Sequence, residues 1–191
     1  MDEERLTEKT LTSECLYDGR IVKLYKDEVL LPSGSTGVRE HIRHIGAACV
    51  VALTPENELL LVRQYRYPFG AVLTEVPAGK LDSPDEDPRS AALRELKEET
   101  GADADRLIDL GVFYPTCAYT NERIFMYLAT NVRPGVQHLD EDEFLRYRTV
   151  GLEAFVEQIL AGEVPDGKTQ TAVLKAWHYL KKQGNSGEVQ A

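Results

Sequence analysis

The sequence lacks any apolar run that approaches the ~18 residues of a membrane-spanning helix, so we expect no membrane partner. Its first ten residues, MDEERLTEKT, are charged from the second position and do not resemble a secretory signal. The three cysteines, Cys15, Cys49 and Cys117, are far apart and form no C-x-x-C pair, which argues against a zinc site. These features predict reduced thiols in a cytoplasmic protein.

Positive charge is also scarce. The chain has 22 Lys and Arg against 32 Asp and Glu, which gives a formal net charge of −10. An acidic surface repels phosphate backbones and no basic cluster is present, so we expect no nucleic-acid partner, capped RNA included. A small anionic substrate remains compatible with this charge, because a bound metal ion can reverse the local sign.

The first half of the chain has the pattern of β-strands. Short β-type runs fill residues 14–31, and the turn PSGS follows at 32–35. The largely apolar run GAACVVALTP at 46–55 suits a buried strand. The length of 191 residues fits one domain with a small N-terminal addition.

The first convincing helix follows at about 88–100. Asp87 is a good N-cap, Pro88 fits the first helical position, and Gly101 stands where a C′ residue belongs. Weaker signals predict two closing helices and a disordered tail, at residues 152–161, 169–182 and 184–191. The sequence therefore predicts a mixed α/β protein in which strands dominate the first two thirds.

Three glutamates on this first helix are unusual. Glu95, Glu98 and Glu99 are spaced so that their side chains converge on one side, where like charges destabilise a helix. One interpretation is a solvated acidic face that Arg94 and Lys97 balance. The other is a set of carboxylate ligands for Mg²⁺ or Mn²⁺.

The loop before the helix favours the metal interpretation. It joins a predicted strand to the helix and contains a glycine and several acids: Gly79, Asp82, Asp85, Glu86 and Asp87. Such a loop brings backbone carbonyls and carboxylates close to the acidic helix face. Mg²⁺ takes few protein ligands beside substrate phosphates, and it polarises phosphoryl oxygens.

Together the loop and helix resemble the Nudix box, G-x5-E-x7-R-E-U-x-E-E-x-G-U, where U is aliphatic. The half R-E-L-x-E-E-x-G is matched in full at residues 94–101, and Glu86 stands at the correct distance before it. Six residues instead of five separate Gly79 from Glu86, so the first acid of the box is either Asp85 or Glu86. Ala102 is a weak match to the closing aliphatic position. On this resemblance the chain is identified as a member of the Nudix family.

Three further stretches narrow the resemblance to one branch. EVPAGKLD, VRQYRYP upstream and TNER downstream are similar to ADP-ribose and nucleoside-diphosphate-sugar pyrophosphatases, so the resemblance covers most of residues 12–180. That branch often has Pro-Gly before its downstream acid, where this chain has Cys117 and Ala118. The departure bears on ADP-ribose itself and leaves diphosphate hydrolysis in place.

The resemblance implies an α/β fold, the Nudix α/β/α sandwich with a small N-terminal β region. We expect residues 1–45 to form N-terminal strands with roles in dimerisation and substrate binding. Residues 46–183 would form the Nudix hydrolase domain, and residues 184–191 a disordered tail. Because this branch exchanges such strands across a two-fold axis, we predict a homodimer.

The resemblance also implies the metal site. Four ligands are expected around Mg²⁺, with Mn²⁺ as the alternative: the carbonyl of Ala78 and the carboxylates of Glu95, Glu98 and Glu99. Glu98 is also counted among the catalytic residues. Arg94 and Glu86 are expected to orient the loop and the glutamates without binding the metal.

A later acidic run, residues 140–143, is expected to supply the general base. We favour Glu143, with Glu141 as the alternative, and interpret the rest of the run as a solvated loop. Four side chains are expected to contact the substrate: Arg39, Arg66, Asp82 and Glu122. Among them Arg66 would bind phosphate and Glu122 would lie near the terminal ribose.

The predicted reaction is attack of water on one phosphorus of a nucleoside diphosphate sugar, assisted by Mg²⁺. With ADP-ribose the products would be AMP and ribose 5-phosphate. Two alternatives stay open: GDP-mannose or another sugar nucleotide as the main substrate, and a Nudix-type ligand-binding module without catalysis.

Overall fold

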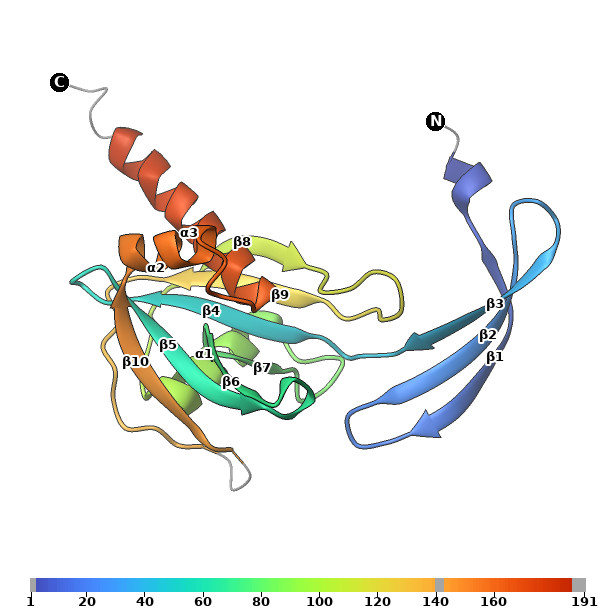
Figure 1. Cartoon of the computed structure of the whole chain (residues 1–191), viewed down its shortest axis with the longest axis horizontal. Coiled ribbons are helices and arrows are strands. Elements are labelled where there is room, and N and C mark those ends of the chain that lie inside the picture. The colour runs from blue at the N-terminus through green and yellow to red at the C-terminus, as the bar shows by residue number, and fades with distance from the viewer. Residues whose placement is uncertain (1–2, 140–142, 187–191) are drawn as a thin grey trace. The chain divides into compact units, whose positions relative to one another are not determined.

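A computed structural model describes residues 3–139 and 143–186, which belong to two units of the chain (Figure 1). The first unit runs through Ile45 and also includes Thr116–Arg123, and the second includes Gly46–Pro115 and the chain from Ile124 onward. The predicted division after residue 45 did not include Thr116–Arg123. Backbone pairing explains the difference, because the N–H of Ile42 donates to the carbonyl of Tyr119 at 2.8 Å.

The first unit is built on an antiparallel sheet in the order β1-β2-β3. A short 3-10 turn precedes its strands, and the bounds are η1 Glu3–Leu6, β1 Lys9–Asp18, β2 Lys23–Leu30 and β3 Thr36–Ile42. Every side chain of β1 is exposed. Among the described side chains of this unit only Asp27 and Val29 are buried, so the sheet has almost no core of its own.

The second unit contains a mixed sheet of seven strands within the described ranges. Its main path is β10-β5-β4-β9-β8, while β6 pairs with β5 and β7 pairs with β4. The bounds are β4 Ala47–Leu53, β5 Glu58–Arg66, β6 Ala71–Glu75, β7 Ala78–Lys80, β8 Ile108–Phe113, β9 Ile124–Ala129 and β10 Leu145–Gly151, with a 3-10 turn, η2, at Tyr67–Phe69. Strands β4 and β9 are parallel and the other pairs are antiparallel.

Helices cover both faces of this sheet (Figure 1). Their bounds are α1 Pro88–Thr100, α2 Leu152–Leu160 and α3 Gly167–Ser186. Alternate residues of β4, such as Val51 and Leu53, join Phe155 of α2 and Val173 of α3 in one core cluster. The intervening residues of β4 are also buried, and α1 packs against the same strand from the other side. The predicted α/β/α sandwich with an N-terminal β region is therefore confirmed.

Local signals placed the helices well at their N-termini. Helix α1 begins at Pro88 as predicted, and Asp87 accepts hydrogen bonds from two backbone N–H groups, at 3.4 and 3.3 Å. Gly101 ends the helix in the left-handed region, with φ of 70°. Helix α3 continues to Ser186, past residue 184 where the disordered tail was expected to begin, and the tail itself stays a prediction. Residues 187–191 lie outside the described residues.

None of the helices in the described ranges is both long and apolar enough to cross a membrane.

Candidate functional site

Two of the three glutamates on α1 are buried. Glu95 is 7% exposed and Glu99 is 3% exposed, while the side chain of Glu98 is 37% exposed. Burial raises the pKa of Glu95 to about 7, although Arg94 opposes the shift. Burial and the nearby Glu95 also raise the pKa of Glu99 well above its ordinary value. Carboxylates buried this close together resist ionisation unless a cation joins them.

Arg94 connects the helix to the loop that precedes it. Its guanidinium contacts four carboxylates and a carbonyl: Glu95 at 2.7 Å, Glu98 at 3.2 Å, Glu86 and Asp82 each at 3.4 Å, and the oxygen of Lys80 at 3.2 Å. Glu86 also accepts the backbone N–H of Asp82 at 2.6 Å. Of the two candidate first acids, Glu86 is therefore the one that contacts Arg94. The expected orienting role of both residues stays a prediction.

Strand β7 lies directly against the buried glutamates. The N–H of Ala78 donates to Oε2 of Glu99 at 3.0 Å. A Cβ at Gly79 would overlap the carboxylate of Glu95, so only glycine allows this close approach. The predicted role of the Ala78 carbonyl as a metal ligand is untested.

A segment that the sequence did not single out packs on the C-terminal end of α1. The N–H groups of Gly135 and His138 donate to the carbonyls of Thr100 and Glu98, both at 2.9 Å. The side-chain amide of Gln137 donates to the carbonyl of Glu99 at 2.6 Å. These bonds satisfy carbonyls that the last turn of a helix leaves without partners. The local signal in this part of the sequence is the Pro134-Gly135 pair, which is typical of a turn and gives no information on what the segment packs against.

The segment leads to the acidic run that was expected to hold the base. The charge of Glu143 contributes to the raised pKa of both Glu95 and Glu99, so the structure brings this carboxylate close to the helix glutamates. Glu141 lies outside the described residues. The choice of Glu143 as the base stays a prediction.

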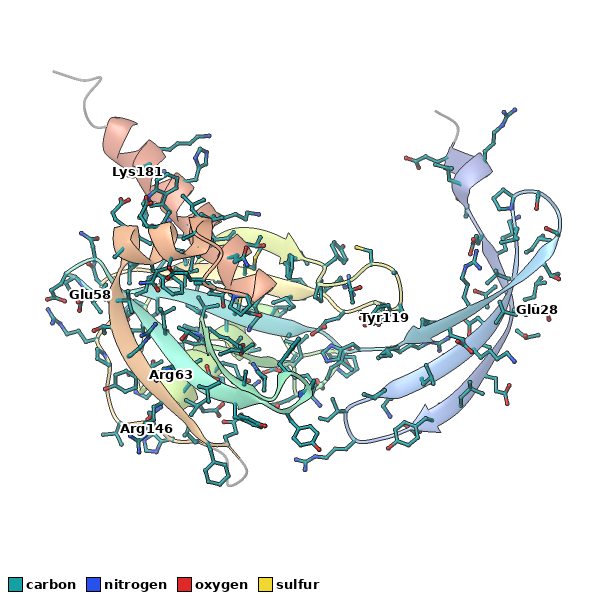
Figure 2. All side chains as sticks on the ribbon, in the orientation of Figure 1. Glu28, Glu58, Arg63, Tyr119, Arg146 and Lys181 are labelled. Atoms are coloured by element: carbon teal, nitrogen blue, oxygen red, sulfur yellow. The ribbon has the colours of Figure 1, made fainter. Side chains whose placement is uncertain are left out.

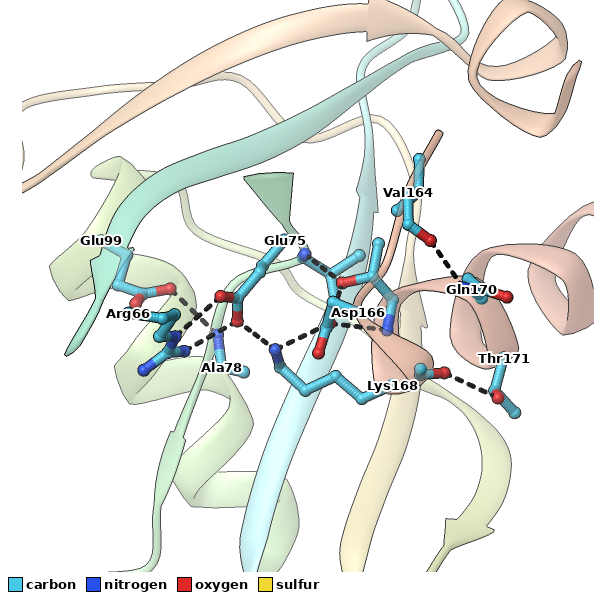
Figure 3. A network of polar contacts seen from close by, with 12 residues as sticks. Arg66, Glu75, Ala78, Glu99, Val164, Asp166, Lys168, Gln170 and Thr171 are labelled. Atoms are coloured by element: carbon cyan, nitrogen blue, oxygen red, sulfur yellow. Dashed lines mark hydrogen bonds and ion pairs between the residues drawn. The ribbon is translucent and has the colours of Figure 1, made fainter. Parts of the chain in front are cut away.

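Arg66 faces the same region but has an internal partner. Its Nε and Nη2 each bond an oxygen of Glu75 at 2.7 Å, and Lys168 also contacts this carboxylate (Figure 3). Glu99 is close enough to help raise the pKa of Arg66. Neither Glu75 nor Lys168 could be recognised from the sequence as part of the site, because a lone charged residue in a strand or at a helix start carries no spacing signal.

A cleft of about 530 Å³ opens beside Glu143. Its lining includes Arg63 and Tyr65 of β5, and Arg146 of β10. Arg63 and Arg146 lie directly opposite each other on the paired strands, and both are labelled in Figure 2. Neither guanidinium forms an ion pair with a residue in the described ranges. Like charges opposite each other are unfavourable, so this cleft suits an anion.

Two other predicted substrate contacts, Arg39 and Glu122, belong to the first unit. Arg39 pairs with Glu8, with Nε and Oε2 2.9 Å apart, and Glu122 lies 3.8 Å from Nδ1 of His44. The structure therefore gives both residues partners within that unit. Their contacts with substrate stay predictions.

The helix glutamates fit a hard divalent cation by their donor chemistry, since two are buried carboxylates close to a third acid. In the parts of the chain that the structure describes, however, no group of three His, Cys, Asp or Glu side chains is arranged as a metal site. Arg94 holds Glu95 and Glu98, and Ala78 holds Glu99. A metal ion would have to compete with these contacts for the same oxygens.

Comparison with protein families divides the chain close to Ile45, as the fold does, but groups Thr116–Arg123 with the later part of the chain. A family model described as the NUDIX domain matches residues 43–172. A second model, described as the nucleoside diphosphate sugar hydrolase N-terminal domain, matches residues 8–42.

Several known proteins are similar over nearly the whole chain. A "Methanol dehydrogenase activator" of Bacillus methanolicus is 41% identical over 178 residues, covering 92% of this chain and 94% of the relative. An "ADP-ribose pyrophosphatase" of Bacillus subtilis is 38% identical over 170 residues, covering 88% and 91%. A solved structure described as an "ADP compounds hydrolase" superposes with a TM-score of 0.81 at 25% identity, covering 93% of this chain and 96% of the other.

Proposed function

Because this chain belongs to the Nudix family of pyrophosphate hydrolases, we propose that its substrate is ADP-ribose or a related nucleoside diphosphate sugar. The observation that carries the proposal is the gathering of the buried Glu95 and Glu99 with Glu143 and with the cationic Arg66. Carboxylates that need a cation, next to a guanidinium that can bind an anion, suit a diphosphate that binds together with a metal.

Members of the family generally depend on a divalent metal. We propose Mg²⁺, with Mn²⁺ as the alternative, held by Glu95, Glu98, Glu99 and the carbonyl of Ala78. Such an ion would polarise the phosphoryl oxygens and stabilise the charge that develops on them. Both buried glutamates would then be ionised, since the cation compensates for their mutual repulsion.

The remaining roles belong to side chains of the chain itself. Glu143 accepts the proton of the attacking water, and Arg66 binds a phosphate. Water adds to one phosphorus and the bridging oxygen leaves, so that ADP-ribose gives AMP and ribose 5-phosphate. Arg39, Asp82 and Glu122 contact other parts of the substrate.

We further propose that the protein is a homodimer. The support is the exposed sheet of the first unit, which has only two buried side chains among its described residues. A sheet of this size needs an apolar face packed against something to be stable. A second copy of the chain would supply that surface.

The direct test is release of AMP from ADP-ribose with Mg²⁺, beside EDTA and beside GDP-mannose. We expect metal-dependent cleavage of ADP-ribose and a loss of at least ~10²-fold in kcat for Glu99→Gln, because the buried carboxylate is expected to bind the metal. Glu157→Gln on α2 changes the same residue type outside the site and should behave as wild type. Faster cleavage of GDP-mannose would move the proposal to that substrate. A folded protein that binds ADP-ribose but cleaves neither compound would be a binding module.

A second function is worth testing because of one relative. The protein named as an activator of methanol dehydrogenase is at least as similar to this chain as the ADP-ribose pyrophosphatase is. Adding this protein to a purified methanol dehydrogenase, with wild type and Glu99→Gln compared, tests activation. Activation that Glu99→Gln abolishes would tie the effect to hydrolysis, and unchanged dehydrogenase rates would rule this function out.

A further inference from the structure

Arg66 is the partly exposed end of a network of charged side chains that continues through Glu75 and Lys168 to Asp166 (Figure 3). Glu75 ends β6 with 2% of its side chain exposed, and it accepts hydrogen bonds from Arg66 and Lys168. Lys168 is 11% exposed and also donates to Asp166 at 2.9 Å. Burial would raise the pKa of Glu75, but Arg66 and Lys168 outweigh it and lower this pKa to about 2. The carboxylate therefore stays ionised between two cations.

The start of α3 holds Lys168 in place. Oδ2 of Asp166 accepts the N–H of Thr169 at 3.0 Å, a contact typical of an N-cap, at the end of the helix that favours an anion. The buried hydroxyl of Thr169 donates to the same oxygen at 2.5 Å and accepts the N–H of Val76 at 3.0 Å. Helix α3 is thus attached to the end of β6, and Lys168 is directed at Glu75.

This arrangement fixes the plane of the Arg66 guanidinium. Nε and Nη2 bond the two oxygens of Glu75, each at 2.7 Å, in the paired geometry that Arg and carboxylate prefer. The other donors on Nη1 and Nη2 point away from Glu75 and bond no described residue, and the side chain is 38% exposed. A guanidinium that is fixed on one edge and open on the other is suited to phosphate oxygens.

We propose that Lys168 and Glu75 are positioning residues, which hold Arg66 in the orientation that binds the substrate diphosphate. The inference rests on the proposed function, in which Arg66 contacts a phosphate. Lys168 and Nη2 of Arg66 share one oxygen of Glu75. Without the ammonium, the carboxylate can rotate about its terminal bond, and Arg66 then loses its defined plane.

A purely stabilising role explains this network poorly. Buried ion pairs can often be replaced by apolar side chains of similar volume at no cost in stability. The network also adjoins the expected metal site, because Ala78, three residues after Glu75, donates its N–H to Glu99 at 3.0 Å. One short segment therefore contacts the phosphate-binding arginine at one end and an expected metal ligand at the other.

The test is a double-mutant cycle on KM and kcat for ADP-ribose with Mg²⁺. Lys168→Met removes the ammonium and keeps most of the stem. We expect this variant to raise KM by about 5–10-fold and to change kcat by less than about twofold, since it weakens a charge-assisted contact to the substrate. In an Arg66→Ala background the same change should leave KM where it is, because Lys168 acts through Arg66. Lys168→Arg should recover most of the loss.

Lys181→Met on the same helix is the matched control. Its ammonium pairs with Glu153 at 3.0 Å and is 54% exposed, so its KM should equal that of wild type. Glu75→Gln is the second variant should Lys168→Met fail to fold, and it should also raise KM. A folded Lys168→Met with a lower Tm and a wild-type KM would overturn the positioning role and leave the proposed function standing.

Binding of ADP, measured by calorimetry, separates this inference from the proposed function. If wild type does not cleave ADP-ribose, the proposed function fails, and the Kd for ADP decides the inference. A weaker Kd in Lys168→Met supports the positioning role, and an equal Kd overturns it. A wild type that neither cleaves ADP-ribose or GDP-mannose nor binds ADP would overturn both.

Discussion

Among the described residues of the second unit three glutamates are buried, and their neighbours give them very different pKa values. Glu75 has two cationic partners and a pKa of about 2, whereas Glu95 has a pKa of about 7 because burial dominates over Arg94. Glu99 is shifted in the same direction as Glu95. Glu75 is a fixed internal counter-ion, whereas an additional cation would stabilise the ionised forms of Glu95 and Glu99. Burial alone therefore does not identify a metal ligand.

The low pKa of Glu75 predicts a pH dependence of stability. Its folded pKa lies below the ordinary 4.5, so the ion pair stabilises the fold above pH 4.5 and this contribution is lost as pH falls toward 2. Between pH 6 and pH 3 we expect the advantage of wild type over Glu75→Gln to shrink by ~2 kcal/mol. Urea unfolding followed by the fluorescence of Trp177, the single tryptophan, measures it.

Exposed acids titrate in both proteins, so the difference between them isolates the buried group. Glu157→Gln on α2 serves as a second comparison and should keep a constant offset from wild type over the same range. A constant offset for Glu75→Gln as well would contradict the low pKa.

Helix α1 and the segment packed on its end show what could be predicted at the scale of elements. The helix was predictable because its signals are local: Asp87 and Gly101 mark its ends, and the glutamates follow at fixed spacing. The segment at residues 135–138 was not, because its backbone groups pair with carbonyls far away in sequence. Glu75 and Lys168 were missed for the same reason, since 93 residues separate them.

The packing of that segment on α1 depends on the absence of a side chain at Gly135. A Cβ at Gly135 would lie 2.5 Å from the carbonyl oxygen of Gly101, and backbone cannot move aside as a side chain can. Gly135→Ala should therefore detach the segment from α1 and displace Glu143. We expect kcat to fall by roughly 10²-fold, because a base moved by about 1 Å works poorly.

Affinity for the metal should change little in Gly135→Ala, since α1 itself is intact, and Mn²⁺ binding measured by electron paramagnetic resonance checks this. Gly184→Ala on α3 is the control, because a Cβ there meets nothing within 4 Å. Equal loss of metal binding and of turnover would show that the substitution had disturbed the helix instead of the segment.

For the whole molecule, the family motif predicted the α/β/α sandwich of the second unit. It did not predict that Thr116–Arg123, which lie between two strands of that sandwich in the sequence, belong to the first unit. Their placement there depends on pairing of Ile42 with residues about eighty positions later, which leaves no local pattern. The sequence also could not rank substrates, because Arg39 and Glu122 belong to a different unit from the helix glutamates. A motif fixes the spacing of residues within one segment, and it gives no information on which residues from another unit contact the substrate.

The exposed sheet of the first unit predicts that the protein forms a dimer. Strand β1 is exposed along its whole length, including Leu11 at 50%, Leu16 at 46% and Tyr17 at 60%. Exposed apolar side chains on a three-stranded sheet indicate a surface that another molecule covers, and we expect that molecule to be a second copy of this chain. Sedimentation equilibrium at micromolar concentration should give twice the chain mass of 21.4 kDa.

A substitution on β1 tests whether this strand forms the dimer interface. Tyr17→Asp should weaken the dimer by about tenfold or more, since it removes an aromatic side chain that the dimer is expected to bury. Thr12→Asp places the same charge on the same strand without removing an aromatic, so it should weaken the dimer much less. A wild-type protein that sediments as a monomer would contradict the prediction.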